Sequence, residues 1–206
     1  MEKTHLSKEE CANIWTHGAA ALLSVVALAM LLQQGLRIGS FRHMVSFGVF
    51  GASLVLVYSS STLLHRYQKN ILELLDHAAI YLLIAATQTP FLLITLHDRR
   101  SMALLALVWS LSLAGIAVKV RTYRSGISGS VLYYAAVCWT AVFAVPPLHD
   151  RLPPAGFGLL LGGVLLYMFG VIFYIWRKIP YHHAIWHLFV AAGSAAHFFA
   201  VLRYVR

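Results

Sequence analysis

Seven long apolar segments run through the chain of 206 residues and constrain its fold more than any other feature. Most of them approach the ~20 residues that a helix needs to cross ~30 Å of hydrocarbon. Short connections with turn and charge signals separate them. We therefore expect an all-α protein, a seven-transmembrane helix bundle that forms one domain over residues 1–206. The expected spans cover residues 13–33, 43–65, 75–96, 102–120, 130–146, 154–176 and 183–202.

The composition and the charge pattern agree with a membrane protein. Hydrophobic residues make up 60% of the chain and charged residues 11%, whereas a soluble domain averages about 45–50% and about 25%. The net charge of +9 is spread in short pairs between apolar runs, where Lys and Arg reach lipid headgroups. Because no basic stripe forms, we expect no nucleic-acid partner. A cytoplasmic N-terminus places nine Lys and Arg inside and seven outside, which favours that orientation.

Five polar side chains stand out, because a polar group inside a membrane span is unfavourable without a partner. They are Ser61, His65, Asp76, His183 and His187. Ser61 and His65 are four residues apart, as are the last two histidines, and this spacing places side chains on one helix face. The spans alternate in direction, so most of these groups meet near one membrane side. Three imidazoles and a carboxylate in a dry site are typical of a catalytic zinc centre with an open position.

Other interpretations of these residues stay open. The histidines of the last segment can be interfacial residues at a wetted helix start. Asp76 can pair with Arg66 or Lys69 in the adjacent loop. It can instead act as general base on a metal-bound water, or complete the metal shell. Ser61 can bond its own backbone carbonyl, or it can orient the water and steady an oxyanion.

Three polar residues at the start of the first segment share a helix face because their spacings are three and four. They are Glu10, Asn13 and His17, which lie on the same membrane side as the histidines. We expect them to brace the site from behind as a carboxylate–amide–imidazole chain. Helix capping by Asn13 is the alternative for that residue.

Two more histidines lie in the last segment. His182 points about 100° away from His183 around the helix, so we expect it at the surface. His197 lies ten residues beyond His187, about 15 Å along the axis, which is too far to share one metal. We expect it to form a hydrogen bond inside the bundle, with Ser194 as the candidate partner.

Four stretches of sequence, in this order, resemble the hemolysin III family and its relatives, the progestin and adipoQ receptors. More distantly they resemble the superfamily that includes the alkaline ceramidases. The stretches are ECANIWTHG at 10–18, STLLH at 61–65, LDH at 75–77 and HHAIWHLFV at 182–190. The stretch at 85–90 departs from the form associated with bacterial members, chiefly at Gln88.

The resemblance implies a seven-helix protein of the bacterial inner membrane with a cytoplasmic N-terminus. It also implies zinc held by His65, His183 and His187. In the family pattern Asp76 holds the zinc water, and Ser61 is the serine one turn before the first histidine ligand. Receptor activity toward a protein hormone is not expected, since the long N-terminal soluble region of the animal receptors is absent.

Three functions are compatible with these observations. The first is a zinc-dependent hydrolase of a lipid amide or ester that serves membrane lipid homeostasis. The second is a membrane-state sensor or regulator in which zinc is structural. The third, suggested by the family name, is a pore-forming cytolysin. Membrane lipid is the expected substrate or ligand. Small residues of the sixth segment can allow close helix packing, within the bundle or in an oligomer: Gly158, Gly162, Gly163 and Gly170.

Overall fold

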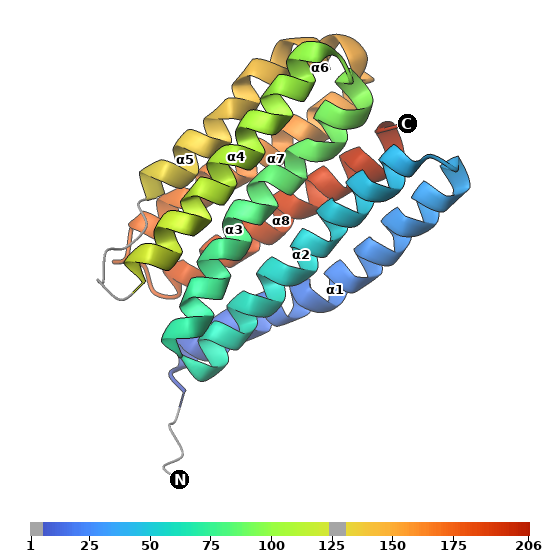
Figure 1. Ribbon diagram of the computed structural model, residues 1–206. Coiled ribbons are helices and arrows are strands. Elements are labelled where there is room, and N and C mark those ends of the chain that lie inside the picture. The colour runs from blue at the N-terminus through green and yellow to red at the C-terminus, as the bar shows by residue number, and fades with distance from the viewer. Residues whose placement is uncertain (1–5, 124–130) are drawn as a thin grey trace.

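The computed structural model describes residues 6–123 and 131–206, and within these ranges it is helical with no strand. Figure 1 shows a bundle of roughly aligned helices with the two termini at opposite ends. This confirms the all-α prediction. The elements are α1 (Lys8–Ile38), α2 (Phe41–Tyr67), α3 (Asn70–Pro90), the π-helix η1 (Phe91–Leu96), α4 (Arg99–Thr122), α5 (Val131–Trp139), the 3-10 helix η2 (Thr140–Ala144), α6 (Val145–Arg151), α7 (Pro154–Ile175) and α8 (His182–Tyr204).

Six helical segments within the described ranges are long and apolar enough to cross a membrane. They are α1, α2, α3 together with η1, α4, α7 and α8. The expected span at 130–146 is divided instead, because η2 interrupts the α-helical pattern between α5 and α6. Residue 130, where that span was expected to begin, lies outside the described residues.

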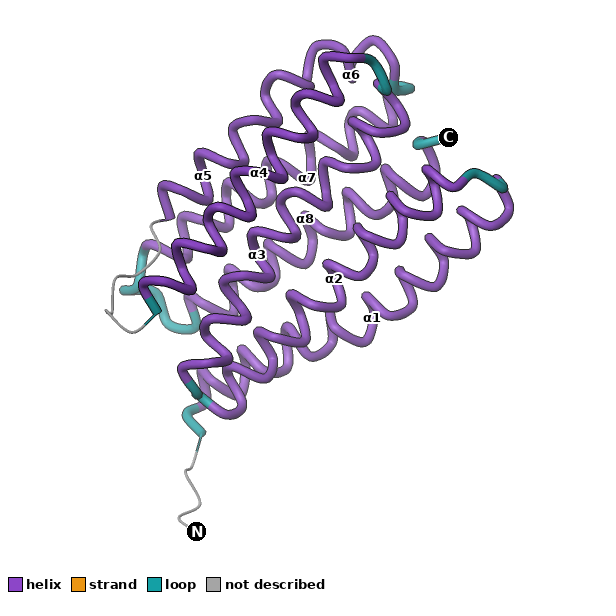
Figure 2. Tube along the Cα trace, viewed as in Figure 1, coloured by secondary structure: helices purple, strands orange, loops and turns teal. Residues whose placement is uncertain are grey.

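Most of the described connections between helices are shorter than the sequence suggested. Between α1 and α2 only Gly39 and Ser40 are non-helical. Gly39 has φ 70°, a left-handed conformation that glycine adopts without strain, and its N–H bonds the carbonyls of Gly35 and Leu36. Gln68 ends α2 in the same left-handed region. Figure 2 shows loops only at the two ends of the bundle, so helices that are joined by a loop run antiparallel.

Pro90 marks a change of helix type in the third span. It ends α3, and η1 continues the chain to Leu96 with π-helical hydrogen bonding. Proline has no N–H to donate to the preceding turn, so the regular α-helical pattern cannot continue through it unchanged. His97 closes the segment in a left-handed conformation, with its N–H bonded to the carbonyl of Leu92.

Candidate metal centre

Three histidines from α2 and α8, which are far apart in the sequence, meet inside one end of the bundle. One ring nitrogen from each of His65, His183 and His187 lies within 4.8 Å of the other two. His65 stands in the last turn of α2, and the other two stand in the first turns of α8. His187 is fully buried, His65 is 9% exposed and His183 is half-buried. The structure thus brings together the three residues that the sequence spacing suggested, in an arrangement compatible with a metal ion.

Two of these rings are already held through their outer nitrogens. Nδ1 of His65 lies 2.7 Å from the Glu10 carboxylate, which accepts a hydrogen bond from the Nδ1–H. Nδ1 of His187 lies 3.1 Å from Oγ1 of Thr16. That hydroxyl already donates to carbonyls of its own helix, so its oxygen accepts a hydrogen bond from the Nδ1–H of His187. Both rings therefore present the lone pair of Nε2 inward, as metal ligands require. Nε2 of His187 is buried and has no hydrogen-bond partner, which fits a ligand atom.

The first helix supplies the residues behind the cluster. Asn13 lies inside α1, with its amide nitrogen 3.4 Å from Nδ1 of His65. It does not cap the helix, because Ser7 does so by accepting a hydrogen bond from the N–H of Glu10. The predicted face of α1 is therefore directed at the cluster, with Glu10 and Asn13 behind His65.

His17 contacts a different part of the site. Its ring stacks on His187, with centroids 3.4 Å apart and planes inclined by 13°. Its Nδ1 lies 2.7 Å from Oγ of Ser61, so the partner of Ser61 is an imidazole rather than its own backbone carbonyl. Nε2 of His17 is buried without a partner. The sequence placed both residues near the metal but did not predict that they bond each other.

Asp76 is half-buried and is not a member of the histidine triad. Its carboxylate is not among the ligand atoms grouped within 4.8 Å, and its hydrogen-bond partner is Oγ of Ser60 at 3.5 Å. No ion pair joins it to Arg66 or Lys69 among the described residues. Glu73, one turn earlier in α3, forms an ion pair instead, with its Oε1 3.7 Å from Nζ of Lys119.

Two residues with direct contacts to the site were missed in the sequence. Thr16 orients His187, and Ser60 donates a hydrogen bond to Asp76. Thr16 lies three residues after Asn13, so helical spacing alone could have placed it on the site face. No such signal distinguishes Ser60 within the run of three serines at 59–61.

Of the two remaining histidines of α8, His182 differs from expectation, whereas His197 forms the expected hydrogen bond inside the bundle with a different partner. His182 is half-buried rather than at the surface, and its Nδ1 donates to the carbonyl of Phe173. His197 donates to the carbonyl of Gly193 at 2.8 Å and not to Ser194. One turn of helix separates His197 from Gly193, and this local acceptor lies in easier reach than the serine.

Ser194 instead joins a network of hydroxyl groups that links three helices. Tyr58 of α2 donates to Ser194 at 2.6 Å, and Tyr167 of α7 lies 2.8 Å from the same oxygen. All three side chains are buried or half-buried. We call Tyr58, Tyr167 and Ser194 the hydroxyl network.

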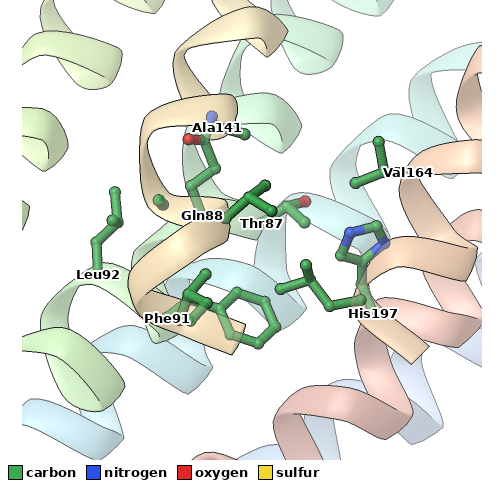
Figure 3. Close-up of a pocket in the computed structure, with 11 residues that line it drawn as sticks. Thr87, Gln88, Phe91, Leu92, Ala141, Val164 and His197 are labelled. Atoms are coloured by element: carbon green, nitrogen blue, oxygen red, sulfur yellow. The ribbon is translucent and has the colours of Figure 1, made fainter. Parts of the chain in front are cut away.

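A cavity of about 50 Å³ lies deeper in the bundle, lined by residues of α3, η1, η2, α6, α7 and α8 (Figure 3). His197, Thr87 and Gln88 supply its polar atoms, and the other side chains around it are apolar. The amide of Gln88 reaches Thr140 only at 3.5 Å. Gln88, the residue at which the sequence departs from the bacterial pattern, therefore faces a cavity that the triad does not line.

The fold and this site define a helical membrane protein with a buried three-histidine cluster. The chain belongs to the haemolysin-III-related family, whose model matches residues 5–198. It is therefore an integral, multi-pass membrane protein.

Named relatives from bacteria and animals match nearly the whole chain. A hemolysin-3 homolog of Bacillus subtilis (strain 168) is 51% identical over 96% of this chain and 94% of its own length. Hemolysin-3 of Bacillus cereus is 47% identical over 98% of this chain and 94% of its own length. The human monocyte to macrophage differentiation factor is 24% identical over 96% of this chain and 84% of its own length.

Proposed function

We propose that the protein is a zinc-dependent hydrolase of a lipid amide or ester that serves membrane lipid homeostasis. One observation carries the proposal: His65 and His187 are fixed through Nδ1, which leaves Nε2 of each free, and the three histidines bring one ring nitrogen each within 4.8 Å of one another. Three imidazole ligands with an open fourth position are the pattern of catalytic rather than structural zinc. Among the described residues no fourth ligand atom joins the group, which is consistent with an open position.

Zinc, when bound, supplies Lewis acidity and makes a bound water acidic near neutral pH. In the proposal, Asp76 takes a proton as general base, and its contact with Ser60 orients the carboxylate. Ser61 supports the oxyanion of the reacting carbonyl and is held in place by His17. Glu10, Asn13 and Thr16 keep the ligand rings oriented.

The proposed topology has seven membrane crossings in one domain over residues 1–206. Helical structure is continuous from α5 through η2 to α6, and its 131–151 range corresponds to about 31 Å at 1.5 Å per residue. That length suffices for a crossing despite the 3-10 interruption. We further place the protein in the bacterial inner membrane with its N-terminus in the cytoplasm, as the excess of Lys and Arg on that side favours.

Membrane lipid is the proposed substrate, since the histidine cluster lies near the end of α2 and the start of α8, and the ends of membrane-spanning helices adjoin the headgroups. Nucleic acid is not a proposed partner. Oligomer formation is supported at one place only, where Gly158 and Gly162 of α7 face open space. Gly163 and Gly170 pack within the bundle, against His197 and Phe189 respectively.

The test begins with metal content, measured by mass spectrometry on detergent-purified protein. We expect about one zinc ion per chain. Fatty acid release from lipid vesicles should then fall by about 100-fold or more in Asp76→Asn, with zinc retained, because a general base contributes about 10²–10⁴-fold. Asp150→Asn, in an exposed carboxylate of α6, is the matched control. Unchanged hydrolysis in Asp76→Asn would contradict the proposed role.

Two other functions predict different results. A regulator with structural zinc would retain its metal against chelators and release no fatty acid. A pore, which the names of the bacterial relatives suggest, would conduct ions in liposomes whether or not His187 is replaced by alanine.

A further inference from the structure

A second cavity, of about 320 Å³, opens at the end of the bundle where α2 meets α3. His65 lies on its wall, so the cavity adjoins the histidine cluster. Exposed residues of the turn between the helices, Gln68 to Asn70, form its rim. The volume lies within the range of about 300–1,000 Å³ that small-molecule sites occupy. We call it the turn cavity.

Two carboxylates line one part of the turn cavity, each with an oxygen to spare. Glu10 uses Oε2 to bind His65. Glu73 uses Oε1 toward both Lys119 and His77, at 3.7 Å each. Among the described residues, the second oxygen of neither carboxylate has a hydrogen-bond or ion-pair partner. These oxygens can accept hydrogen bonds from a cationic group in the cavity.

The opposite charge comes from the turn itself. Lys69 is exposed and forms no ion pair within the described chain. It is also the N-cap residue of α3, where no side chain caps the helix. The first N–H groups of a helix lack acceptors within the helix and attract anions. The lysine and these N–H groups together suit a phosphate group.

We propose that the turn cavity binds the headgroup of a zwitterionic phospholipid, with its phosphate at Lys69 and its ammonium group between Glu10 and Glu73. This deepens the proposed function, on which it rests, by naming the class of lipid substrate. A headgroup in this position lies at the membrane surface, and the acyl linkages below it lie beside His65. An anionic headgroup has no ammonium group to place between Glu10 and Glu73, and an uncharged diacylglycerol would use neither charge.

The test uses short-chain diether lipids, which cannot be hydrolysed at an ester. Binding of dihexyl ether analogues of phosphatidylethanolamine, phosphatidylglycerol and diacylglycerol is measured by calorimetry on the zinc-loaded protein. The ethanolamine lipid should bind most tightly. Lys69→Ala should weaken it about fivefold, since a lysine near an anionic lipid group contributes about 1 kcal/mol. Lys69→Glu should weaken it further and leave the diacylglycerol analogue unaffected.

Arg66→Glu is the matched control, because it reverses an exposed positive charge at the same membrane side but outside the turn cavity. The thermal midpoint of each variant shows that it is folded. Equal binding of the ethanolamine and glycerol headgroups would overturn the proposal, as would equal effects of Lys69→Glu and Arg66→Glu.

Failure of this inference and failure of the hydrolase proposal are distinguishable. Diether binding that depends on Lys69, without fatty acid release from the matching ester lipid, would overturn the hydrolase and retain the headgroup site. Fatty acid release with no preference among headgroups would do the reverse.

Discussion

The histidine cluster and the hydroxyl network are both buried and polar, but their hydrogen bonds are completed to different degrees. Around the cluster, three buried atoms have no partner: Oδ1 of Asn13, Nε2 of His17 and Nε2 of His187. In the hydroxyl network, about 10 Å further along α8, Ser194 is bonded to both tyrosines and none of the three hydroxyl oxygens is unpartnered. A buried polar group without a partner costs about 1–3 kcal/mol.

This difference separates two uses of polar residues inside a membrane protein. A completed network ties helices together and leaves nothing for a ligand to bind. In an incomplete network, a bound ligand can supply the missing partners of the buried polar atoms. Under the proposed function, the hydroxyl network contributes stability and the histidine cluster binds the ligand, so replacements in the two regions should affect different properties.

The largest expected effect is loss of metal from the cluster. His187→Ala removes the most deeply buried imidazole, so we expect the metal content to fall from about one ion per chain to near zero. Mass spectrometry of the purified protein measures it. His182→Ala, in a neighbouring histidine outside the cluster, should retain the metal. Equal loss in both variants would show that the metal is bound elsewhere.

In the hydroxyl network the effect should fall on stability instead. Ser194→Ala leaves the hydroxyls of Tyr58 and Tyr167 without their shared partner, which should lower the free energy of unfolding by about 2 kcal/mol. Denaturation in detergent measures this, and metal content should not change. Ser110→Ala, in an exposed serine of α4, serves as control. A Ser194→Ala variant that loses its metal but keeps its stability would remove the distinction between the regions.

A smaller effect is expected from Thr16, which touches the cluster without being one of its three imidazoles. Thr16→Val keeps the shape of the side chain but removes the acceptor for Nδ1 of His187. Metal affinity should fall by about tenfold, the lower end of the range for residues that orient ligands. Competition with a chelator measures the affinity. Thr62→Val is the control, because Thr62 bonds only the backbone of its own helix.

The smallest effect should come from a site outside both regions. Asp98 caps α4 by accepting the N–H of Ser101, and this bond holds the pKa of the carboxyl below its ordinary value. A depressed pKa in the folded state gives stability that is present above the unfolded pKa of about 3.9 and is lost as the pH falls below it. Thermal midpoints at pH 7 and pH 3 should therefore differ less in Asp98→Asn than in the unchanged protein, while metal content at pH 7 stays the same.

The helix spacing in the sequence was sufficient to group the three histidines and the face of α1. Residues four apart share a face of any α-helix, and alternating spans bring the end of α2 and the start of α8 to one side of the bundle. Spacing does not say which atom bonds which, so the pairing of Ser61 with His17 and of Ser60 with Asp76 needed the structure. His197 was assigned to Ser194 wrongly, because the tyrosines that occupy Ser194 come from α2 and α7. The 3-10 interruption at Thr140–Ala144 had no signal in hydropathy.

The contact between Thr16 and His187 joins residues 171 positions apart, and it has a consequence for biosynthesis. The helix that braces the cluster, α1, leaves the ribosome before α8, the helix that supplies two of its three imidazoles. A nascent or truncated chain without α8 contains only His65 of the triad. Capture of the proposed metal must therefore follow insertion of α8, so bound metal would distinguish molecules that contain α8 from unfinished ones.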